Sequence, residues 1–467
     1  MFGLNRKKCL IIDPGINFLG HLKGFNYPGH FPYGALSVAS FLEKNGLPVS
    51  LVALDNYLQQ TGGAVSREKI LTDVEGIITE RIRGNNISVV GISVTYTPQY
   101  TVSEQIAQIV KRVDPNIKVI IGGQHVSFLD QQVLTGSKSI DAVARGEGEW
   151  TMLDFVNAVL AKRNLAGIDG ISFKDGSLVI RNPDRAFGDI SQLSFMNFGL
   201  IPSSFYRGRL MNVAACRGCM YACKFCAEQI FWGNKVRRVP VEKLLHEAQA
   251  LFNKFKIGYL SFEDSMLPIE SDYFRQLASG LKRIKKGRWG HFVTRVDAVN
   301  ESALKLVKDT GFQYLIFGVE TASDKVLAAM NKKITVDKVE KAFNLSKSSG
   351  LTVGSFWLVG HPGDSYEESQ KSIFYLDKWY SQGLIDNATI ARFVPYPGSD
   401  FFNNPASYGI RIFHYRWEEW RRYRSNGVCD LSDFPDEKIV EIHAKMQSIS
   451  MQSRLFKDIY NHQGVGN

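Results

Sequence analysis

The sequence predicts an α/β protein made of two successive parallel β/α domains and a short, mainly helical C-terminal region. Three observations predict this architecture. Short apolar runs of strand length alternate with helical patterns up to about residue 160, and the same alternation starts again near residue 206. The chain has 467 residues, 44% of them apolar, enough for roughly two to four domains. We expect domains over residues 1–160 and 206–400, a linker over 161–205 and a capping region over 401–467.

Charge and hydropathy exclude several classes of protein. Lys and Arg outnumber Asp and Glu by 56 to 46, but the excess is spread along the chain. Such dispersed charge is typical of solvated faces, so we expect no nucleic-acid partner. No run approaches the ~18 apolar residues of a membrane span, and Cys9–Ile12 is too short for the core of a signal peptide. We expect a cytoplasmic protein that acts on a small molecule.

The first domain contains five β/α repeats. Between the first strands, Ile70, Val74, Ile77 and Arg81 follow helical spacing, and a second helical pattern covers Gln99–Val113. Repeats of this kind imply an open parallel sheet that binds ligands at the carboxyl ends of its strands. The predicted strands are Cys9–Ile12, Val49–Leu54, Ser88–Val94, Lys118–Ile121 and Ala142–Ala144.

Glycine-rich and polar turns follow these strands. Glycines there let a ligand approach the backbone closely, although ordinary tight βα turns have the same composition. No G-x-G-x-x-G follows the first strand, so the fingerprint of a dinucleotide site is absent. The turns are Asp13-Pro14-Gly15, Ser93-Val94-Thr95-Tyr96-Thr97, Gly122-Gly123-Gln124-His125 and Arg145-Gly146-Glu147-Gly148-Glu149.

Together with Phe31-Pro32-Tyr33-Gly34, these turns resemble the Rossmann-like cobalamin-binding domain that precedes many radical S-adenosylmethionine (SAM) enzymes. Such domains often hold cobalt through a histidine in Asp-x-His-x-x-Gly, but His21-Leu22-Lys23-Gly24 lacks the acid. The resemblance therefore implies cobalamin without a histidine beneath the cobalt, with His125 shaping its loop or contacting the corrin edge. The implied contacts are Ser93, Thr95, Gly122, Gly123, His125, Gly146 and Glu147.

The second alternation predicts six parallel β/α units, an incomplete (β/α)6 barrel. Chemistry in barrels is carried out at the carboxyl ends of the strands, and polar residues follow each predicted strand. The strands are Leu210–Ala214, Ile257–Phe262, His291–Val293, Gln313–Gly318, Thr352–Val359 and Thr389–Phe393.

Four of the six cysteines lie within eleven residues, directly after the first of these strands. A disulfide framework would spread its pairs, so this clustering indicates a metal. Structural zinc sites commonly use two separated pairs, whereas compact thiolate runs are typical of iron–sulfur clusters. The spacing Cys219-x3-Cys223-x2-Cys226, with Phe225 before the last thiolate, resembles the radical SAM signature.

That resemblance implies a 4Fe-4S cluster on Cys219, Cys223 and Cys226, whose fourth iron binds SAM and cleaves it to a 5′-deoxyadenosyl radical. Cys216 as a fourth ligand would close the site, and we expect it to be a small buried neighbour instead. The implied SAM contacts are Phe225, Glu263, Asp264, Arg295, Glu320 and Thr321. Without the resemblance, Glu263 and Asp264 could equally cap the next helix.

The tail combines an aromatic and basic stretch, Tyr415–Tyr423, with a final helix that carries Ile439, Ile442, Met446 and Ile449 on one face. Arg and aromatic side chains can stack on bases or sugars, but they also pack capping helices on barrels. We expect the packing role.

The resemblance to class B radical SAM methyltransferases implies cobalamin-dependent methylation of an unactivated carbon in a natural-product or lipid-like substrate. An external flavodoxin- or ferredoxin-like protein would supply electrons. A non-methylating cyclase, dehydratase or rearrangement enzyme, with or without cobalamin, is the alternative. An iron–sulfur electron carrier would need Cys216 as fourth ligand.

Overall fold

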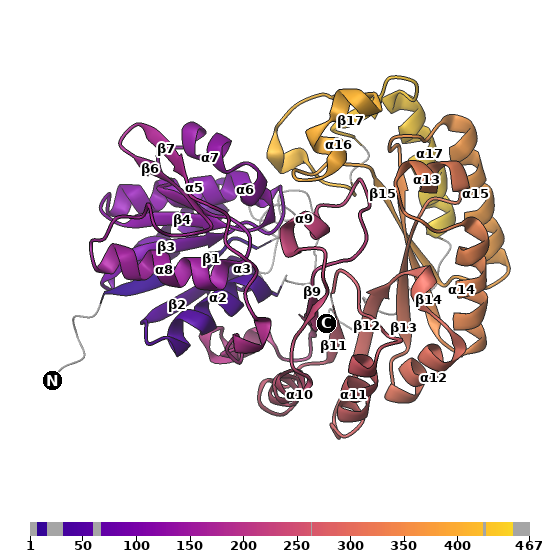
Figure 1. The fold of residues 1–467 in the computed structure, drawn as a ribbon, viewed down its shortest axis with the longest axis horizontal. Helices are drawn as coiled ribbons and strands as arrows, with labels where there is room; N and C mark the ends of the chain where they lie inside the picture. Colours follow the sequence, from indigo (N-terminus) through magenta and orange to yellow (C-terminus); the bar gives the residue numbers. More distant parts are fainter. Residues whose placement is uncertain (1–6, 16–30, 59–66, 263, 424–425, 452–467) are drawn as a thin grey trace. The chain divides into compact units, whose positions relative to one another are not determined.

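The structure, a computed structural model, describes residues 7–15, 31–58, 67–262, 264–423 and 426–451. The chain divides into two compact units (Figure 1). The first unit contains residues 1–205 together with Trp417–Glu419, and the second contains residues 206–416 and 420–467. The expected α/β architecture is confirmed.

The described part of the first unit is built on a sheet in the order β2-β1-β3-β4-β5-β6-β7. The first five strands pair in parallel, and β6 and β7 continue the sheet as an antiparallel hairpin. The strands are β1 (Lys8–Asp13), β2 (Val49–Ala53), β3 (Ile87–Ser93), β4 (Lys118–Gly122), β5 (Ala142–Ala144), β6 (Ile171–Asp175) and β7 (Leu178–Arg181).

The hairpin differs from the linker that we expected over residues 161–205. Phe173 pairs with Ala142 and Ile171 pairs with Ala144, and both partners on β6 are buried. The apolar residues of β6 therefore continue the core of the first sheet, which a short strand beside turn residues does not reveal in the sequence.

Helices cover both faces of this sheet (Figure 1). Helices α2 and α8 pack together, as do α4 and α5. In α4 the buried stripe is Ile70, Val74, Ile78 and Ile82. We predicted Ile77 and Arg81 for its last two positions, so the C-terminal half of the predicted face is displaced by one residue, and Arg81 is exposed. The helices are α2 (Tyr33–Lys44), α3 (Leu54–Leu58), α4 (Arg67–Arg83), α5 (Gln99–Val113), α6 (Gln124–Phe128), α7 (Asp130–Gly136) and α8 (Gly148–Leu160).

The second unit holds, within its described residues, a six-stranded sheet in the order β15-β14-β13-β12-β11-β8, with every neighbouring pair parallel. This is the strand arrangement expected of a partial barrel. The strands are β8 (Leu210–Val213), β11 (Tyr259–Phe262), β12 (Trp289–Thr294), β13 (Tyr314–Glu320), β14 (Thr352–Val359) and β15 (Asn387–Arg392).

Helices that follow these strands begin at residues whose side chains accept a hydrogen bond from the first turn. Ser271, Asn300, Ser323, Thr335 and Ser365 cap α11, α12, α13, α14 and α15 in this way. Each such cap stabilises its helix by about 1 kcal/mol. The helices are α10 (Val241–Ala250), α11 (Asp272–Leu281), α12 (Glu301–Thr310), α13 (Asp324–Ala329), α14 (Val336–Ser348) and α15 (Tyr366–Ser381), with η6 (Leu251–Phe255) continuing α10.

The C-terminal region combines helices with a small sheet. Helix α17 (Asp436–Ser450) packs against α15 and β15 and buries Ile439, Ile442 and Met446. Strands β16 (Ile410–Ile412) and β17 (Cys429–Leu431) form an antiparallel pair, and α16 (Asp400–Asn403) lies just after the last barrel strand. The region is therefore less helical than we expected.

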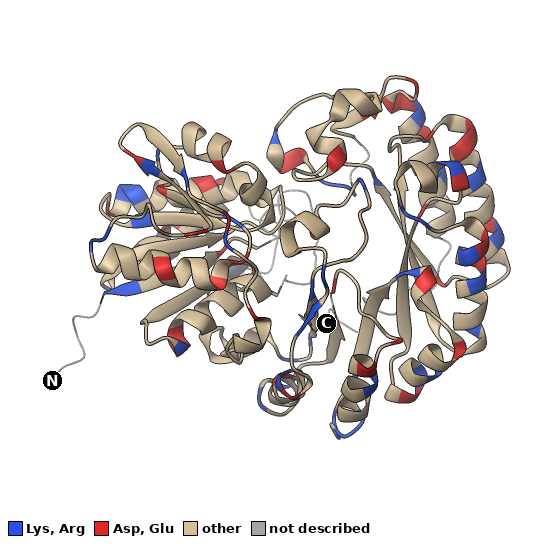
Figure 2. Cartoon of the chain, viewed as in Figure 1, with Lys and Arg blue, Asp and Glu red and all other residues tan. Residues whose placement is uncertain are grey.

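Charges of both signs are mixed on the helices of the second unit, as Figure 2 shows for α14 and α15. Pairs such as Lys305 with Asp309 and Lys341 with Asp337 lie one helical turn apart. Among the described residues, no helix has the length and hydropathy to cross a membrane.

Candidate active site

The predicted cysteine loop leaves the carboxyl end of β8. Cys216 and Arg217 form β9, which pairs with β10 (Arg237–Arg238), and α9 (Glu228–Trp232) follows the loop. Gly218 has φ of +98°, and a Cβ there would lie 2.1 Å from the carbonyl oxygen of Lys235. Only glycine fits this crossing. The next residue, Cys219, donates its backbone N–H to the carbonyl oxygen of Gly233 at 3.2 Å.

Cys219, Cys223 and Cys226 are half-buried and influence one another electrostatically. Burial raises the pKa of each thiol, and that of Cys226 reaches about 12, with smaller contributions from Glu228 and from the other two cysteines. Among the described residues, no three His, Cys, Asp or Glu side chains converge as they would around a single metal ion. Three neighbouring thiols on one loop are the donor set that an iron–sulfur cluster takes, so the residues fit that group.

Cys216 has other charged neighbours than this trio, Asp264 and Arg238. It is buried, and its pKa is raised by burial and by the nearby charge of Asp264. Its backbone N–H donates to Asp264 Oδ1 at 2.5 Å. Asp264, which follows β11, therefore holds the backbone of β9. Its predicted partner in SAM binding, Glu263, lies outside the described residues.

The cysteine loop is fixed against two other segments of the second unit. The backbone N–H of Lys224 donates to the carbonyl of Met330 at 3.0 Å, and Asn331 Nδ2 donates to the carbonyl of Ala222 at 2.7 Å. The carbonyl of Lys224 accepts from the N–H of Phe401, the second residue of α16, at 3.3 Å. The loop thus sits on the turn after α13 and beside the carboxyl end of β15.

Arg295 follows β12 and makes a two-pronged contact with Asp297, at 2.8 Å from Nε to Oδ1 and 3.0 Å from Nη2 to Oδ2. Its Nη2 also donates to the carbonyl of Lys332 at 2.7 Å, and its guanidinium lies 3.6 Å from the ring centroid of Tyr221 on the cysteine loop. Arg295 therefore joins β12 to the loop in addition to any contact with SAM.

Glu320 and Thr321 follow β13. Glu320 has φ of +70°, and its Oε1 lies 2.6 Å from Nζ of Lys332. The ammonium of Lys332 lies 5.6 Å from the ring centroid of Phe225, between the last two predicted cluster ligands. Thr321 is buried, and its hydroxyl lies 3.0 Å from that of Ser372. Arg295 thus lies against the cysteine loop, and Glu320 is joined through Lys332 to Phe225 on that loop. The hydroxyl of Thr321 points toward α15.

The turns after the first-unit strands lie at one edge of the first sheet, as predicted. Gly123, after β4, has φ of +120°, and a Cβ there would lie 2.4 Å from the carbonyl oxygen of Val94. The backbones of the turns after β3 and β4 therefore touch at Gly122-Gly123. Ser93 and Thr95 share a hydroxyl contact of 3.4 Å beside them.

His125, in α6, is buried among aromatic rings. Its ring centroid lies 5.2 Å from that of Tyr100 and 4.9 Å from that of Trp417, and its Nδ1 lies 3.2 Å from the Thr97 hydroxyl. Burial lowers its pKa to about 3. Thr101 Oγ1 donates to Glu418 Oε2 at 3.0 Å, which fixes the Trp417 segment on α5. Trp417 and Glu418 therefore pack on the first unit, whereas we expected the aromatic stretch to pack a capping helix on the barrel.

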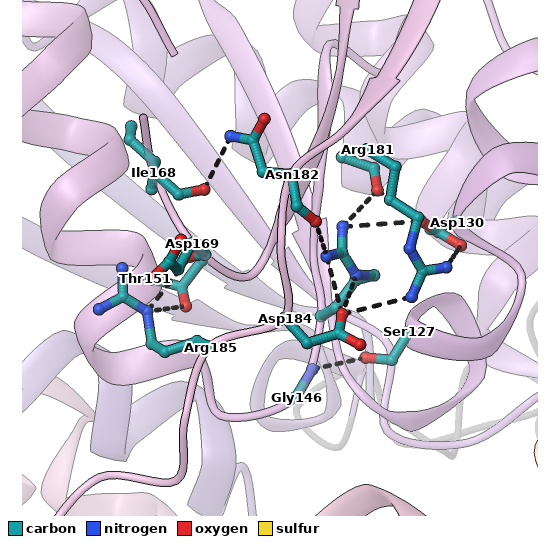
Figure 3. A network of polar contacts seen from close by, with 12 residues as sticks. Ser127, Asp130, Gly146, Thr151, Ile168, Asp169, Arg181, Asn182, Asp184 and Arg185 are labelled. Atoms are coloured by element: carbon teal, nitrogen blue, oxygen red, sulfur yellow. Dashed lines mark hydrogen bonds and ion pairs between the residues drawn. The ribbon is translucent and has the colours of Figure 1, made fainter. Parts of the chain in front are cut away.

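A polar network fixes the turn after β5 (Figure 3). The guanidinium of Arg145 contacts Asp184 at 2.8 Å and the hydroxyl of Ser172 at 2.5 Å, and the N–H of Gly146 donates to Ser127 Oγ at 3.1 Å. Glu147 is buried and accepts the N–H of Gly188 at 3.1 Å. The backbone of Gly146 therefore lies near the Gly122-Gly123 turn, whereas the carboxylate of Glu147 stabilises the chain at Gly188.

Three residues near these sites were missed or undervalued by sequence reasoning. Asp13 is buried at the end of β1, where burial and nearby Asp55 raise its pKa to about 7. Asp13 ends β1 and Asp55 lies just after the neighbouring strand β2, and these two positions are the signal in the sequence that could have paired them. Lys332 follows α13, and nothing local in the sequence places it beside Phe225.

Comparison with known proteins agrees with this geometry. Residues 213–376 match the Radical SAM superfamily, and residues 27–156 match the B12 binding domain. The chain is 29% identical over 396 residues to an uncharacterized methyltransferase of Pyrococcus horikoshii, covering 83% of this chain and 84% of the relative. It is 29% identical over 378 residues to the anaerobic magnesium-protoporphyrin IX monomethyl ester cyclase of Rubrivivax gelatinosus, covering 77% and 66%.

Among solved structures, the radical SAM methyltransferase TsrM of Kitasatospora setae, with cobalamin and a [4Fe-4S] cluster bound, shares the fold. The TM-score is 0.75 at 16% identity, over 95% of this chain and 91% of the other. The fold and the sequence matches define a radical SAM enzyme. With its B12 binding domain, the chain resembles cobalamin-dependent radical SAM methyltransferases, as expected, and the expected cofactors, a 4Fe-4S cluster, SAM and cobalamin, are confirmed.

Proposed function

We propose that this enzyme methylates an unactivated carbon of a small natural-product or lipid-like molecule, with cobalamin as the methyl carrier. The observation that carries the proposal is the cysteine loop at the carboxyl end of β8, in a chain that also has a B12 binding domain. Cys219, Cys223 and Cys226 are the proposed cluster ligands.

The bound cofactors supply one-electron cleavage of SAM and transfer of its methyl group. For a substrate R–H, two SAM molecules and two electrons from an external donor give R–CH3, S-adenosylhomocysteine, methionine and 5′-deoxyadenosine. The hydrogen that leaves the substrate is recovered in 5′-deoxyadenosine, so atoms and charge balance. The electron donor is proposed to be a flavodoxin- or ferredoxin-like protein.

The chain's own residues support an open cluster. The backbone of Cys216 is bonded to Asp264 and its strand pairs with β10, so Cys216 is fixed in β9, before the loop that carries the other three thiols. Three ligands leave one iron for SAM. We assign the SAM side of the site to Phe225, Arg295 and Glu320, which adjoin the loop, whereas the described contacts of Asp264 and Thr321 favour a supporting role.

The cobalamin side of the site is proposed at the turns after β3, β4 and β5. Gly122, Gly123 and Gly146 bring bare backbone to this edge, and Ser93 and Thr95 add hydroxyls. His125 is enclosed by Tyr100 and Trp417, which suits a residue that shapes the pocket rather than a cobalt ligand.

The test uses full-length protein, reconstituted anaerobically and loaded with hydroxocobalamin. We expect the electron paramagnetic resonance (EPR) signal of the reduced cluster to change on addition of SAM. With reductant and SAM but no substrate, we expect about one S-adenosylhomocysteine per bound cobalamin. An EPR signal that does not change when SAM is added would contradict the assignment of these cysteines to a radical SAM cluster.

A second candidate function, radical cyclisation or rearrangement without methyl transfer, is favoured by the similarity to the magnesium-protoporphyrin cyclase. The same experiment separates the two. The second candidate predicts 5′-deoxyadenosine without S-adenosylhomocysteine.

A further inference from the structure

Lys332 is a buried cation beside the cysteine loop. Its side chain is 6% exposed, and its ammonium lies 2.6 Å from Oε1 of Glu320, whose side chain is 10% exposed. The ammonium also lies 5.6 Å from the ring centroid of Phe225. An ammonium has three hydrogen-bond donors, and one carboxylate oxygen uses one of them. The side chain is buried, so the charge of the ammonium is little screened by water.

The backbone is shaped to bring these two side chains together. Glu320, Asn331 and Lys333 all have positive φ, at +70°, +56° and +58°. A Cβ on Gly318 would lie 2.8 Å from Glu320 Oε1 and 3.0 Å from Lys332 Nζ, so the ion pair packs directly on bare backbone. Such strain persists only where the surrounding structure enforces it and is concentrated at functional sites.

The pair is coupled to Cys223 through the same turn. Met330 and Asn331 make hydrogen bonds with the backbone of the cysteine loop, which places the next residue, Lys332, beside residues 222–226. Phe225, whose ring lies 5.6 Å from the Lys332 ammonium, stands two residues after Cys223 and directly before Cys226. Both charges of the pair therefore lie close to the predicted cluster ligands, with opposite signs.

We propose that the Lys332–Glu320 pair sets the reduction potential of the cluster held by Cys223. Lys332 stabilises the additional negative charge of the reduced cluster, and Glu320 both fixes the ammonium and opposes its effect. The proposal rests on the proposed assignment of Cys223 as a cluster ligand. Net charge and hydrogen bonds near the sulfurs are established determinants of cluster potentials.

The test is a potentiometric titration of the reconstituted holoprotein, with the cluster followed by EPR. Lys332→Met should make the potential more negative, so that at the wild-type midpoint the ratio of reduced to oxidised cluster falls about tenfold or more. Glu320→Gln should shift the potential in the opposite direction. The double variant should return toward the wild type, because both charges are removed.

Lys333→Met is the matched control. Lys333 is the exposed neighbour of Lys332. This variant removes the same charge at a position where water screens it, so the reduction potential of the cluster should not change. Iron content and circular dichroism verify that each variant holds its cluster and fold. If the Lys332→Met protein does not hold its cluster, the proposal is tested with Glu320→Gln alone. A less negative reduction potential in that variant supports the proposal.

Shifts in the same direction for both single variants, or none in either, would overturn this proposal. A wild-type protein that binds no cluster would instead overturn the assignment of the cysteines. The two failures are therefore distinguishable.

Discussion

Asp264 Oδ1 accepts the backbone N–H of Cys216 at 2.5 Å, which ties the end of β11 to the start of the cysteine loop. Removing a buried acceptor leaves its donor unsatisfied, so Asp264→Ala should lower the free energy of unfolding by about 1–3 kcal/mol. Asp264→Asn keeps an acceptor oxygen and should lose much less. Urea unfolding of the apoprotein measures both. Equal losses for Ala and Asn would show that the carboxylate charge, rather than this hydrogen bond, is what matters.

Cys216 and Cys223 differ in their surroundings, and their substitutions should differ accordingly. Cys216 faces Asp264 and Arg238, whereas Cys223 interacts with Cys226, Lys332 and Arg295. Cys216→Ala should retain the iron and sulfide of the wild-type protein after reconstitution, and Cys223→Ala should lose most of both. Iron and sulfide analysis with visible spectroscopy checks this. The reverse pattern would require a different set of ligands.

Gly218 predicts a third outcome. A methyl group at this position would lie 2.1 Å from the carbonyl oxygen of Lys235, on a residue with positive φ. Gly218→Ala should displace β9 from β10, cost about 1–3 kcal/mol and reduce cluster assembly. Gly208→Ala, which also has positive φ but open space around its Cβ, is the matched control. If both variants assemble equal amounts of cluster, strain alone, not the crossing with Lys235, explains any loss.

The sequence predicted what is encoded locally. The order of strands and helices follows hydrophobic periodicity, and the cysteine spacing identifies the loop because the ligands lie on one short segment. It did not predict contacts between distant residues, such as Asp264 with Cys216, Glu320 with Lys332, or Trp417 with His125. These depend on which loops meet at a sheet edge, and periodicity carries no such information.

The errors have the same origin. The hairpin β6–β7 was expected to be linker because its strands are short and gain their apolar partner only from β5. The SAM contact of Thr321 stays a prediction, and the sequence did not indicate the 3.0 Å contact between its hydroxyl and that of Ser372 on α15. His21, weighed as a cobalt ligand, lies outside the described residues, and so does Glu263.

His125 should make stability depend on pH. Burial lowers its pKa to about 3, whereas an unfolded histidine titrates near 6.5. The folded state therefore disfavours the protonated ring. The stability conferred by the neutral form is complete above about pH 6.5 and decreases as the pH falls toward 3, by about 1.4 kcal/mol per unit.

His125→Gln removes this titration, so the free energy of unfolding of the wild type minus that of the variant should fall by about 2 kcal/mol between pH 6.5 and 5. Other buried histidines are present in both proteins and cancel in the difference. Trp417→Ala exposes the His125 ring to water, so the free energy of unfolding of this variant should also depend less on pH than that of the wild type. Denaturant unfolding at each pH measures these values, and a difference that stays constant with pH would mean that the ring is solvated in solution.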